Sequence, residues 1–222
     1  MVPDPDATGD STGDSIGDWL TSSSDDPTEV AGRYDDWARS YDADLSSWSY
    51  RAPDTVAGIV LDRGVTGSVL DVGCGTGLVG RTLRDRGFGG RLLGLDISQA
   101  SLDQARETGA YDSLDRADLQ QRLPLDDDSV DATVCVGVMT YLPEVEAVWR
   151  EFARVTRTGG TVVVTQREDL WQARECQAVV ERLEADGTWT SLDLTGPAAY
   201  LPDGYGGGPA VGCYYLTAVV GG

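Results

Sequence analysis

The chain has 222 residues, of which 41% are hydrophobic, and this length and composition suit one domain with a full core. It carries 37 acidic and 17 basic residues, a net charge of −20, so no basic stripe is available for a large nucleic-acid footprint. No apolar run reaches the length of about 18 residues that marks a membrane span. The acidic, polar beginning of the sequence lacks the features of a secretory signal, and we expect a cytoplasmic protein.

The charge pattern predicts a halophilic environment. Every basic residue is an arginine, since lysine and histidine are absent, and most of the acids are aspartate. Such a surface repels itself in dilute buffer, whereas at molar salt the screening length falls to about 3 Å. We therefore expect the protein to come from the cytosol of a halophilic archaeon rather than to be an ordinary acidic protein.

The cysteines predict no metal site. Their positions show no paired spacing, and the chain has no histidine to complete a ligand set. We expect four reduced and mostly buried thiols: Cys74, Cys135, Cys176 and Cys213.

The N-terminal part divides into a tail and a helical entry segment. Residues 1–25 are rich in Asp, Gly, Ser and Thr and predict a disordered acidic tail, followed by one domain over 26–222. Asp26 and Glu29 form a capping-box pattern, so a first helix begins there, and the entry helices extend to about residue 64. One face of the first helix carries apolar residues at spacings of three and four, which suit either core packing or a lid: Val30, Tyr34, Trp37 and Tyr41.

From residue 68 onward, predicted strands and helices alternate. The helices are expected at 78–86, 98–107, 144–155 and 170–185, after an entry helix at 53–62. The strands are expected at 68–72, 91–97, a short segment ending near 117–119, 129–138, 159–167, 188–194 and 213–220. This alternation predicts an α/β fold with a doubly wound, mostly parallel seven-stranded sheet. The last two strands have no comparable helix between them, so the last strand is expected to be antiparallel.

The segment "VLDVGCGTGLVG", residues 69–80, fits two glycine-rich fingerprints. Gly73, Gly75 and Gly77 suit a loop that wraps a nucleotide-type cofactor, whereas the glycines at 75, 77 and 80 spell a dinucleotide fingerprint. Such a loop lies between a strand and the N-terminus of a helix, where backbone N–H groups face a ligand. An NAD-dependent oxidoreductase therefore stays open as an alternative.

Three successive predicted strands each end near an aspartate. Asp71, Asp96 and Asp118 are therefore expected at one edge of the sheet, which is where open parallel sheets bind ligands. A carboxylate at Asp96, 19 residues after Gly77, suits the hydroxyl groups of a ribose. Asp71 would repel a nearby diphosphate.

These motifs, with "LGLDIS", "DATVCVGVMTYLP" and "VTRTGGTVVVTQR", resemble the class I S-adenosylmethionine-dependent methyltransferases over roughly residues 27–220. The resemblance implies a Rossmann-like fold in which the loop glycines wrap the methionine portion and Asp71 lies near its amino group. It also implies that Asp96 holds the ribose, with Ile97 on the adenine, and that Asp118 accepts from the adenine amine. The remaining residues that it places around the cofactor are Leu119 and Val136 with its neighbours after the fourth strand, with Tyr34 and Tyr41 as parts of the lid.

Within this family, "YDDWARSYDADLSSWSYRAP" looks like the methyltransferase-like subgroup named for the Williams–Beuren chromosome region. The expected reaction is methyl transfer from S-adenosylmethionine to an unidentified acceptor, most simply a small molecule, with S-adenosylhomocysteine as product. The sequence identifies no catalytic residue; Tyr141 and Arg167 lie near strand ends, where packing or substrate contact explains them. A non-catalytic S-adenosylmethionine-binding protein is a further alternative.

Overall fold

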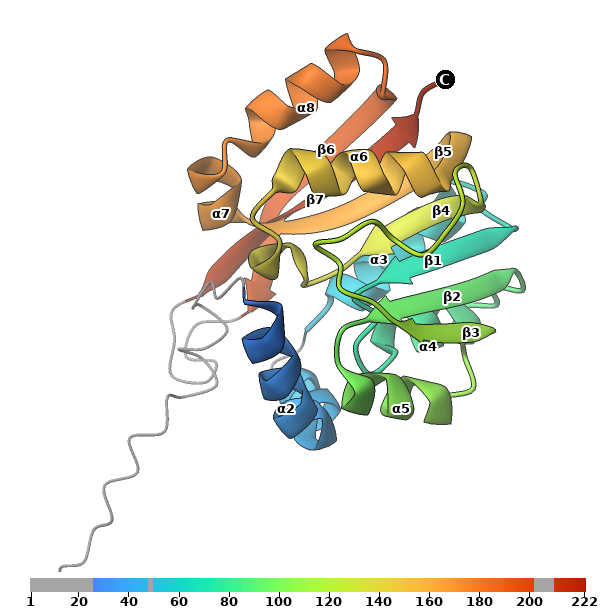
Figure 1. The fold of residues 1–222 in the computed structure, drawn as a ribbon, viewed down its shortest axis with the longest axis vertical. Coiled ribbons are helices and arrows are strands. Elements are labelled where there is room, and N and C mark those ends of the chain that lie inside the picture. The colour runs from blue at the N-terminus through green and yellow to red at the C-terminus, as the bar shows by residue number, and fades with distance from the viewer. Residues whose placement is uncertain (1–25, 48–49, 202–209) are drawn as a thin grey trace, which may run out of the picture.

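The computed structural model describes residues 26–47, 50–201 and 210–222, with the side chains of 39–47, 200 and 201 left out. The tail predicted over residues 1–25 lies outside the described residues. Within the described part, helices cover a central twisted sheet, and the helix at the start of the described chain lies across one end of it (Figure 1).

The sheet has seven strands in the order β3-β2-β1-β4-β5-β7-β6. The first five strands along the chain pair in parallel, and β7 runs antiparallel between β5 and β6. The strands are β1 (Ser68–Val72), β2 (Arg91–Asp96), β3 (Ser113–Arg116), β4 (Val130–Cys135), β5 (Thr156–Arg167), β6 (Trp189–Leu201) and β7 (Val211–Val220). The predicted seven-stranded α/β fold is confirmed, including its antiparallel last strand.

Helices pack on both faces of the sheet because its strands alternate their side chains between the two faces. Val69 of β1 joins the core under α3 and α4, while Leu70 joins the core under α6 and α8. The helices are α2 (Pro27–Ser47), α3 (Ala52–Asp62), α4 (Leu78–Asp85), α5 (Gln99–Glu107), η1 (Met139–Tyr141, a 3₁₀ turn), α6 (Val145–Val155), α7 (Glu168–Ala173) and α8 (Cys176–Ala185). No helix in the described ranges is long and apolar enough to cross a membrane.

Two predicted helix caps form as expected. The Asp26 carboxylate accepts a hydrogen bond from the N–H of Thr28 at 2.8 Å, at the start of α2. The Ser98 hydroxyl group accepts from the N–H of Ser101 at 3.0 Å, at the start of α5. Both caps satisfy backbone donors that a helix leaves unpaired in its first turn.

The single helix predicted over 170–185 was wrong, because the chain breaks it into α7 and α8. Glu175 lies between them in the left-handed region, with φ 48°. Immediately before it, the Arg174 guanidinium donates to the carbonyl oxygens of Met139 and Thr140 in η1, at 2.5 and 2.8 Å. The contact between Arg174 and η1 therefore lies directly beside the break between the two helices.

Candidate active site

A cavity lies at the carboxyl ends of β1, β2 and β4, beneath the start of α2. It encloses about 600 Å³ of empty space, its opening to solvent included. Its lining combines two carboxylates with apolar side chains and backbone. The lining residues are Pro27, Val30, Tyr34, Gly73, Gly75, Asp96, Ile97, Asp118, Leu119, Gln120, Val136, Gly137, Val138, Tyr141 and Leu142.

The structure gathers most of the residues singled out from the sequence in this one cavity. Nine of the candidate site residues line it: Tyr34, Gly73, Gly75, Asp96, Ile97, Asp118, Leu119, Val136 and Tyr141. Asp71 and Gly77 lie outside the lining, at the base of the glycine loop, and the side chain of Tyr41 lies outside the described residues. Arg167 is also outside the lining, where it pairs with Asp169 at 2.6 Å.

The glycine loop needs glycine for both its conformation and its contacts. Gly73, Gly75 and Gly77 have φ of 73°, 53° and 93°, a region that other residues rarely adopt. A Cβ atom at Gly73 would lie 2.2 Å from Cγ2 of Val138, so the loop packs directly on the segment after β4. A Cβ at Gly75, which lines the cavity, would meet nothing within 4 Å, so the space beside this residue is open.

Asp96 ties the end of β2 to the glycine loop. Its Oδ2 accepts from the N–H of Gly75 at 2.8 Å, and its Oδ1 accepts from the N–H of Ser98 at 2.9 Å. The residue is 9% exposed, and burial raises the pKa of its carboxyl group despite these hydrogen bonds. The carboxylate therefore already orders the loop and still contributes to the cavity wall.

Asp71 is buried below the loop and has one free acceptor. Its Oδ2 accepts from the Tyr111 hydroxyl group at 2.6 Å, whereas its Oδ1 has no hydrogen-bond partner among the described residues. Burial raises the pKa of Asp71 to about 7, and the Tyr111 hydrogen bond opposes that rise. A buried carboxylate with an unpaired oxygen is suited to a donor that arrives with a ligand.

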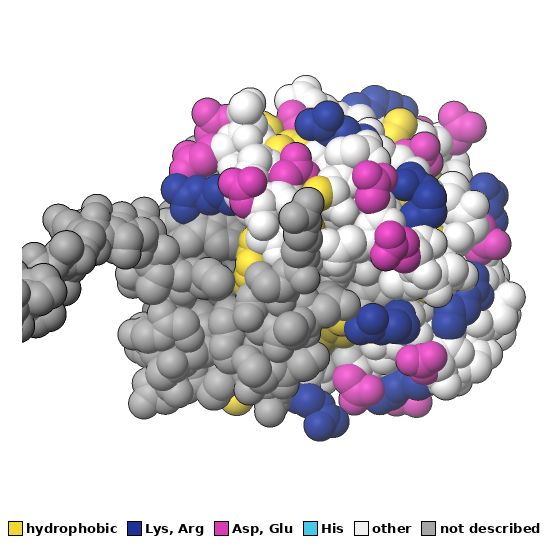
Figure 2. Space-filling model, turned by 90° about the horizontal axis from the view of Figure 1, so that it is seen from below, with side chains coloured by type: hydrophobic (Ala, Val, Ile, Leu, Met, Phe, Trp, Pro, Cys, Tyr) yellow, Lys and Arg dark blue, Asp and Glu magenta, His cyan; other side chains and the backbone are white. Residues whose placement is uncertain are grey.

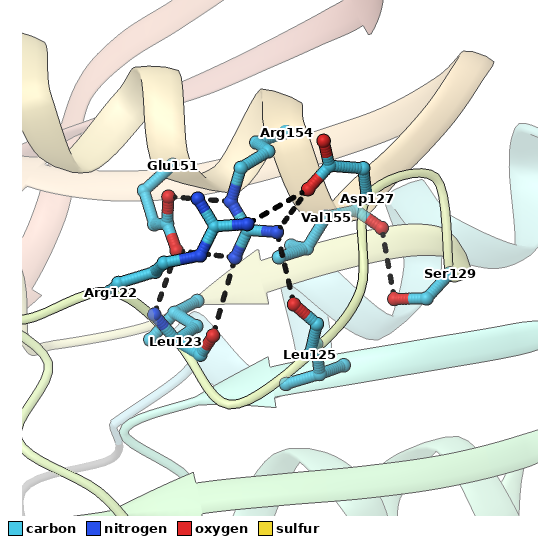
Figure 3. Close-up of polar contacts among 8 residues, drawn as sticks. All are labelled: Arg122, Leu123, Leu125, Asp127, Ser129, Glu151, Arg154 and Val155. Carbon is cyan, nitrogen blue, oxygen red and sulfur yellow. Dashed lines mark hydrogen bonds and ion pairs between the residues drawn. The ribbon is translucent and has the colours of Figure 1, made fainter.

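The segment between β3 and β4 brings Asp118 and Leu119 to the cavity and is held by α6. The Arg154 guanidinium donates to the carbonyl oxygens of Leu125 and Leu123 at 3.0 and 3.2 Å, and pairs with Glu151 at 2.6 Å (Figure 3). The fork shape of arginine allows one side chain to make these contacts together.

The start of α2 covers the cavity. Val30 and Trp37 of this helix are buried with Tyr141 of η1, and the Tyr34 and Tyr141 rings meet edge to face with centroids 5.8 Å apart. The Asp35 carboxylate accepts from the Ser98 hydroxyl group at 2.5 Å, which fastens α2 to the start of α5. Described residues of the predicted lid therefore pack over the site as well as into a small core.

Sequence reasoning missed several cavity residues because they carry no chemical signal of their own. They are Pro27, Gln120, Val138 and Leu142. Gln120 and Leu142 each lie one residue after a residue that had been singled out, and Val138 contacts the glycine loop. Gly137 was expected at the site as a neighbour of Val136, and Val30 was placed on a helix face that suits either core packing or a lid.

Comparison with known proteins identifies the family to which the chain belongs. A family model described as a methyltransferase domain matches residues 70–164, from β1 to β5. Human methyltransferase-like protein 27 is 35% identical over 175 residues, which cover 72% of this chain and 67% of that protein. The chain belongs to the class I S-adenosylmethionine-dependent methyltransferases. S-adenosylmethionine is the methyl donor of this family, and the dehydrogenase alternative is thereby set aside.

Other proteins match over a shorter part of the chain or at lower sequence identity. A malonyl-[acyl-carrier protein] O-methyltransferase from Hamiltonella defensa is 35% identical over 95 residues, 43% of this chain and 36% of that protein. The chain thus spans little more than a third of that relative. A chain solved in complex with the Haloferax volcanii Trm112 methyltransferase activator superimposes with a TM-score of 0.66 at 23% identity. This superposition covers 87% of this chain and 98% of that one and shows the shared fold.

Proposed function

We propose that the cavity binds S-adenosylmethionine and that the chain transfers its methyl group to a small-molecule acceptor. The observation that carries the proposal is the meeting of the loop glycines, Asp96 and Asp118 in one cavity under α2. Two features fit the donor: the open space beside Gly75 and the unpaired Oδ1 of buried Asp71.

In this proposal each group has a binding role. Gly73 and Gly75 follow the methionine portion, and Oδ1 of Asp71 accepts from its ammonium group. Asp96 accepts from the ribose hydroxyl groups, although its oxygens also hold the N–H groups of Gly75 and Ser98. A carboxylate oxygen has capacity for a second donor, so both sets of contacts are compatible.

The adenine is proposed to lie between the ends of β2 and β3. Ile97, Leu119 and Val136 supply apolar surface for its ring, and Asp118 accepts from its exocyclic amine. The N–H of Gln120 already donates to Oδ1 of Asp118 at 3.0 Å, which orients that carboxylate. Gly77 contributes through the loop conformation and not through contact with the donor.

Bound S-adenosylmethionine supplies a methyl group on an electrophilic sulfonium, so the chain has mainly to align the acceptor and exclude water. The start of α2 performs the exclusion, with Val30 and Tyr34 over the cavity. The chain has no histidine, so any general base must be another group. Tyr141 and Tyr34 bring hydroxyl groups to the cavity.

A small acceptor is supported by the way α2 and η1 cover the cavity. A direct test is calorimetric titration with S-adenosylmethionine and NAD(H), followed by measurement of S-adenosylhomocysteine formation with panels of carboxylic acids, phenols and amines. Binding of NAD(H) alone would contradict the proposal. Tight binding of S-adenosylmethionine without turnover on any panel would favour the non-catalytic alternative.

The match to methyltransferase-like protein 27 supports placing the chain in the methyltransferase-like subgroup predicted from its entry segment. A halophilic source is supported by the net charge of −20 with arginine as the only cation. The division into a tail, residues 1–25, and a domain, residues 26–222, is likewise part of the proposal.

A further inference from the structure

Tyr111, between α5 and β3, occupies a slot made by three glycines. A Cβ at Gly80 would lie 2.3 Å from Cζ of the Tyr111 ring. A Cβ at Gly77 would lie 3.2 Å from its Cε2, and one at Gly94 would lie 3.1 Å from its Cδ1. Gly80, the third glycine of the apparent dinucleotide fingerprint, thus leaves the space that the Tyr111 ring occupies.

The hydroxyl group of Tyr111 links two elements that carry the glycine loop. It accepts from the N–H of Gly80 in α4 at 3.0 Å and donates to Oδ2 of Asp71 in β1 at 2.6 Å. Burial and the nearby Asp71 raise the pKa of Tyr111 well above its ordinary value, so the hydroxyl group keeps its proton. Tyr111 is therefore a permanent donor to Asp71.

The position of Tyr111 is itself fixed from α4. Arg84 donates through Nε to the carbonyl oxygen of Ala110 at 2.9 Å and through Nη2 to Asp112 at 3.1 Å. These two residues flank Tyr111 in the chain. Oδ2 of Asp112 also accepts from the N–H of Leu92 at 2.8 Å, which fastens the segment to β2.

We propose that Tyr111 is a positioning residue for the methyl donor: its hydroxyl group holds Oδ2 of Asp71 and leaves Oδ1 for the donor's ammonium group. This inference rests on the proposed function, because it takes S-adenosylmethionine as the occupant of the cavity. Without the hydroxyl group, the carboxylate is free to rotate and its ionised form loses the one hydrogen bond that the described residues give it.

The inference predicts a pH dependence of binding. The titratable groups that face Asp71 are Tyr111, Cys74, Asp96 and Cys135. Of these, Asp96 raises the pKa of Asp71 and the Tyr111 hydrogen bond lowers it, while Asp71 itself raises the pKa of both thiols. Donor affinity therefore falls as the pH drops through about 7, and removal of the Tyr111 hydroxyl group moves that fall to higher pH.

The test compares Tyr111→Phe with the unchanged protein by calorimetry between pH 5.5 and 8.5. The ligands are S-adenosylhomocysteine, which carries the ammonium group, and 5′-methylthioadenosine, which lacks it. Tyr111→Phe is expected to weaken S-adenosylhomocysteine binding about tenfold at pH 7, the effect of one hydrogen bond to a charged group, and to change 5′-methylthioadenosine binding less than about twofold. Tyr214→Phe, on β7 in the other core, is the matched control and is expected to change neither.

The outcomes separate the two proposals. If the unchanged protein binds neither ligand, the proposed function fails and the inference fails with it. If it binds both and Tyr111→Phe weakens both equally, or neither, Tyr111 only packs the loop and the inference alone is overturned. Should Tyr111→Phe not fold, Asp71→Asn replaces it: unchanged S-adenosylhomocysteine binding, or binding that keeps the fall near pH 7, overturns the inference, because Tyr111 acts only through the Asp71 carboxylate.

Discussion

The hydroxyl groups of Tyr34 and Tyr141 lie 3.3 Å apart, and through them α2 contacts the turn that follows β4. Tyr34 belongs to a helix near the start of the domain, and Tyr141 follows it by 107 residues. Both side chains line the cavity, so the covering helix is attached at the site itself. Access to the cavity is expected to depend on this pair.

Replacement of Tyr34 by alanine should make bound S-adenosylmethionine dissociate faster. The edge-to-face contact with Tyr141 is lost, and such contacts contribute about 0.5–1.5 kcal/mol beyond buried area, so the Kd should rise roughly threefold to tenfold. Tyr34→Phe keeps the ring and should show a smaller effect. Stopped-flow dissociation rates measure both variants, and an alanine variant that releases the donor at the original rate would contradict a covering role for α2.

Arg154 and Arg122 form a matched pair for a stability test, since both pair with Asp127 (Figure 3). The Arg154 side chain is 15% exposed and also holds two carbonyl oxygens, whereas the Arg122 side chain is 69% exposed. Arg154→Lys cannot reproduce the fork of contacts and should lower the free energy of unfolding by about 2–3 kcal/mol. Arg122→Lys should change it by less than about 0.5 kcal/mol. Equal midpoints in urea would show that the guanidinium does not hold the segment before β4.

The regular part of the fold was accessible from the sequence because its signals are local. Ser98 as a helix cap and the apolar run before the glycine loop both predict their elements correctly. The break at Glu175 and the slot for Tyr111 were not predicted, since each depends on side chains that meet only in the folded chain. Arg174 reaches carbonyl groups 32 to 35 residues earlier in the chain, and no spacing rule indicates that contact.

The same difference between local and long-range signals explains which residues of the candidate site were predicted. Asp96 and Asp118 were found because strand ends in a parallel sheet share an edge. Gly80 drew attention as part of a fingerprint, but the contact that requires it comes from Tyr111, 31 residues later. Apolar side chains such as Val30 look like core in the sequence, and here one side chain serves both the core and the cavity wall.

Asp71 should make the ligand-free protein less stable as the pH rises from 4 to 7. Its pKa is about 7 in the folded chain against 3.8 for the free side chain, so the folded state binds more protons across that window. The free energy of unfolding should therefore fall by roughly 3–4 kcal/mol between these limits and then level off. Asp96, whose pKa is also raised, adds in the same direction.

Asp71→Asn should remove most of that slope and should be more stable than the unchanged protein at pH 8 without ligand. Below pH 4 the opposite trend begins, because the pKa values of Asp131 and Asp186 are lowered to about 2 and their stabilisation is lost on protonation. Urea unfolding at half-unit pH steps measures both trends. If the free energy of unfolding of Asp71→Asn still falls between pH 4 and 7, the pH dependence belongs to another titratable group.

Asp96→Ala should weaken S-adenosylmethionine binding by about a hundredfold and also loosen the ligand-free loop. The substitution removes the acceptor for the N–H of Gly75 and for that of Ser98, and each unpaired buried donor costs about 1–3 kcal/mol. Asp103→Ala, an exposed carboxylate in α5, is the control. Calorimetry measures the affinities, and hydrogen exchange at the N–H of Gly75 measures how ordered the loop is. Unchanged exchange at Gly75 would show that Asp96 contributes to binding without ordering the loop.

The melting temperature should rise between 0.1 and 3 M KCl if the surface is adapted to salt. Acidic and basic side chains lie interspersed on the face in Figure 2, yet the chain as a whole carries a net charge of −20. If screening of this repulsion raises the free energy of unfolding by about 2 kcal/mol, the melting temperature of a chain of this size rises by roughly 5 °C. Osmolytes without charge, such as sucrose at matched osmolality, separate screening from a general effect of added solute.

A variant with Asp62, Asp126 and Glu184 changed to their amides sharpens that test. All three are exposed, and no ion pair is recorded for them among the described residues. With three fewer negative charges, the variant should melt higher than the unchanged protein at 0.1 M KCl and gain less from added salt. The two proteins should converge at 3 M KCl, where the screening length is shorter than the distance between most surface charges. Parallel salt curves for the two proteins would mean that charge repulsion does not govern their stability.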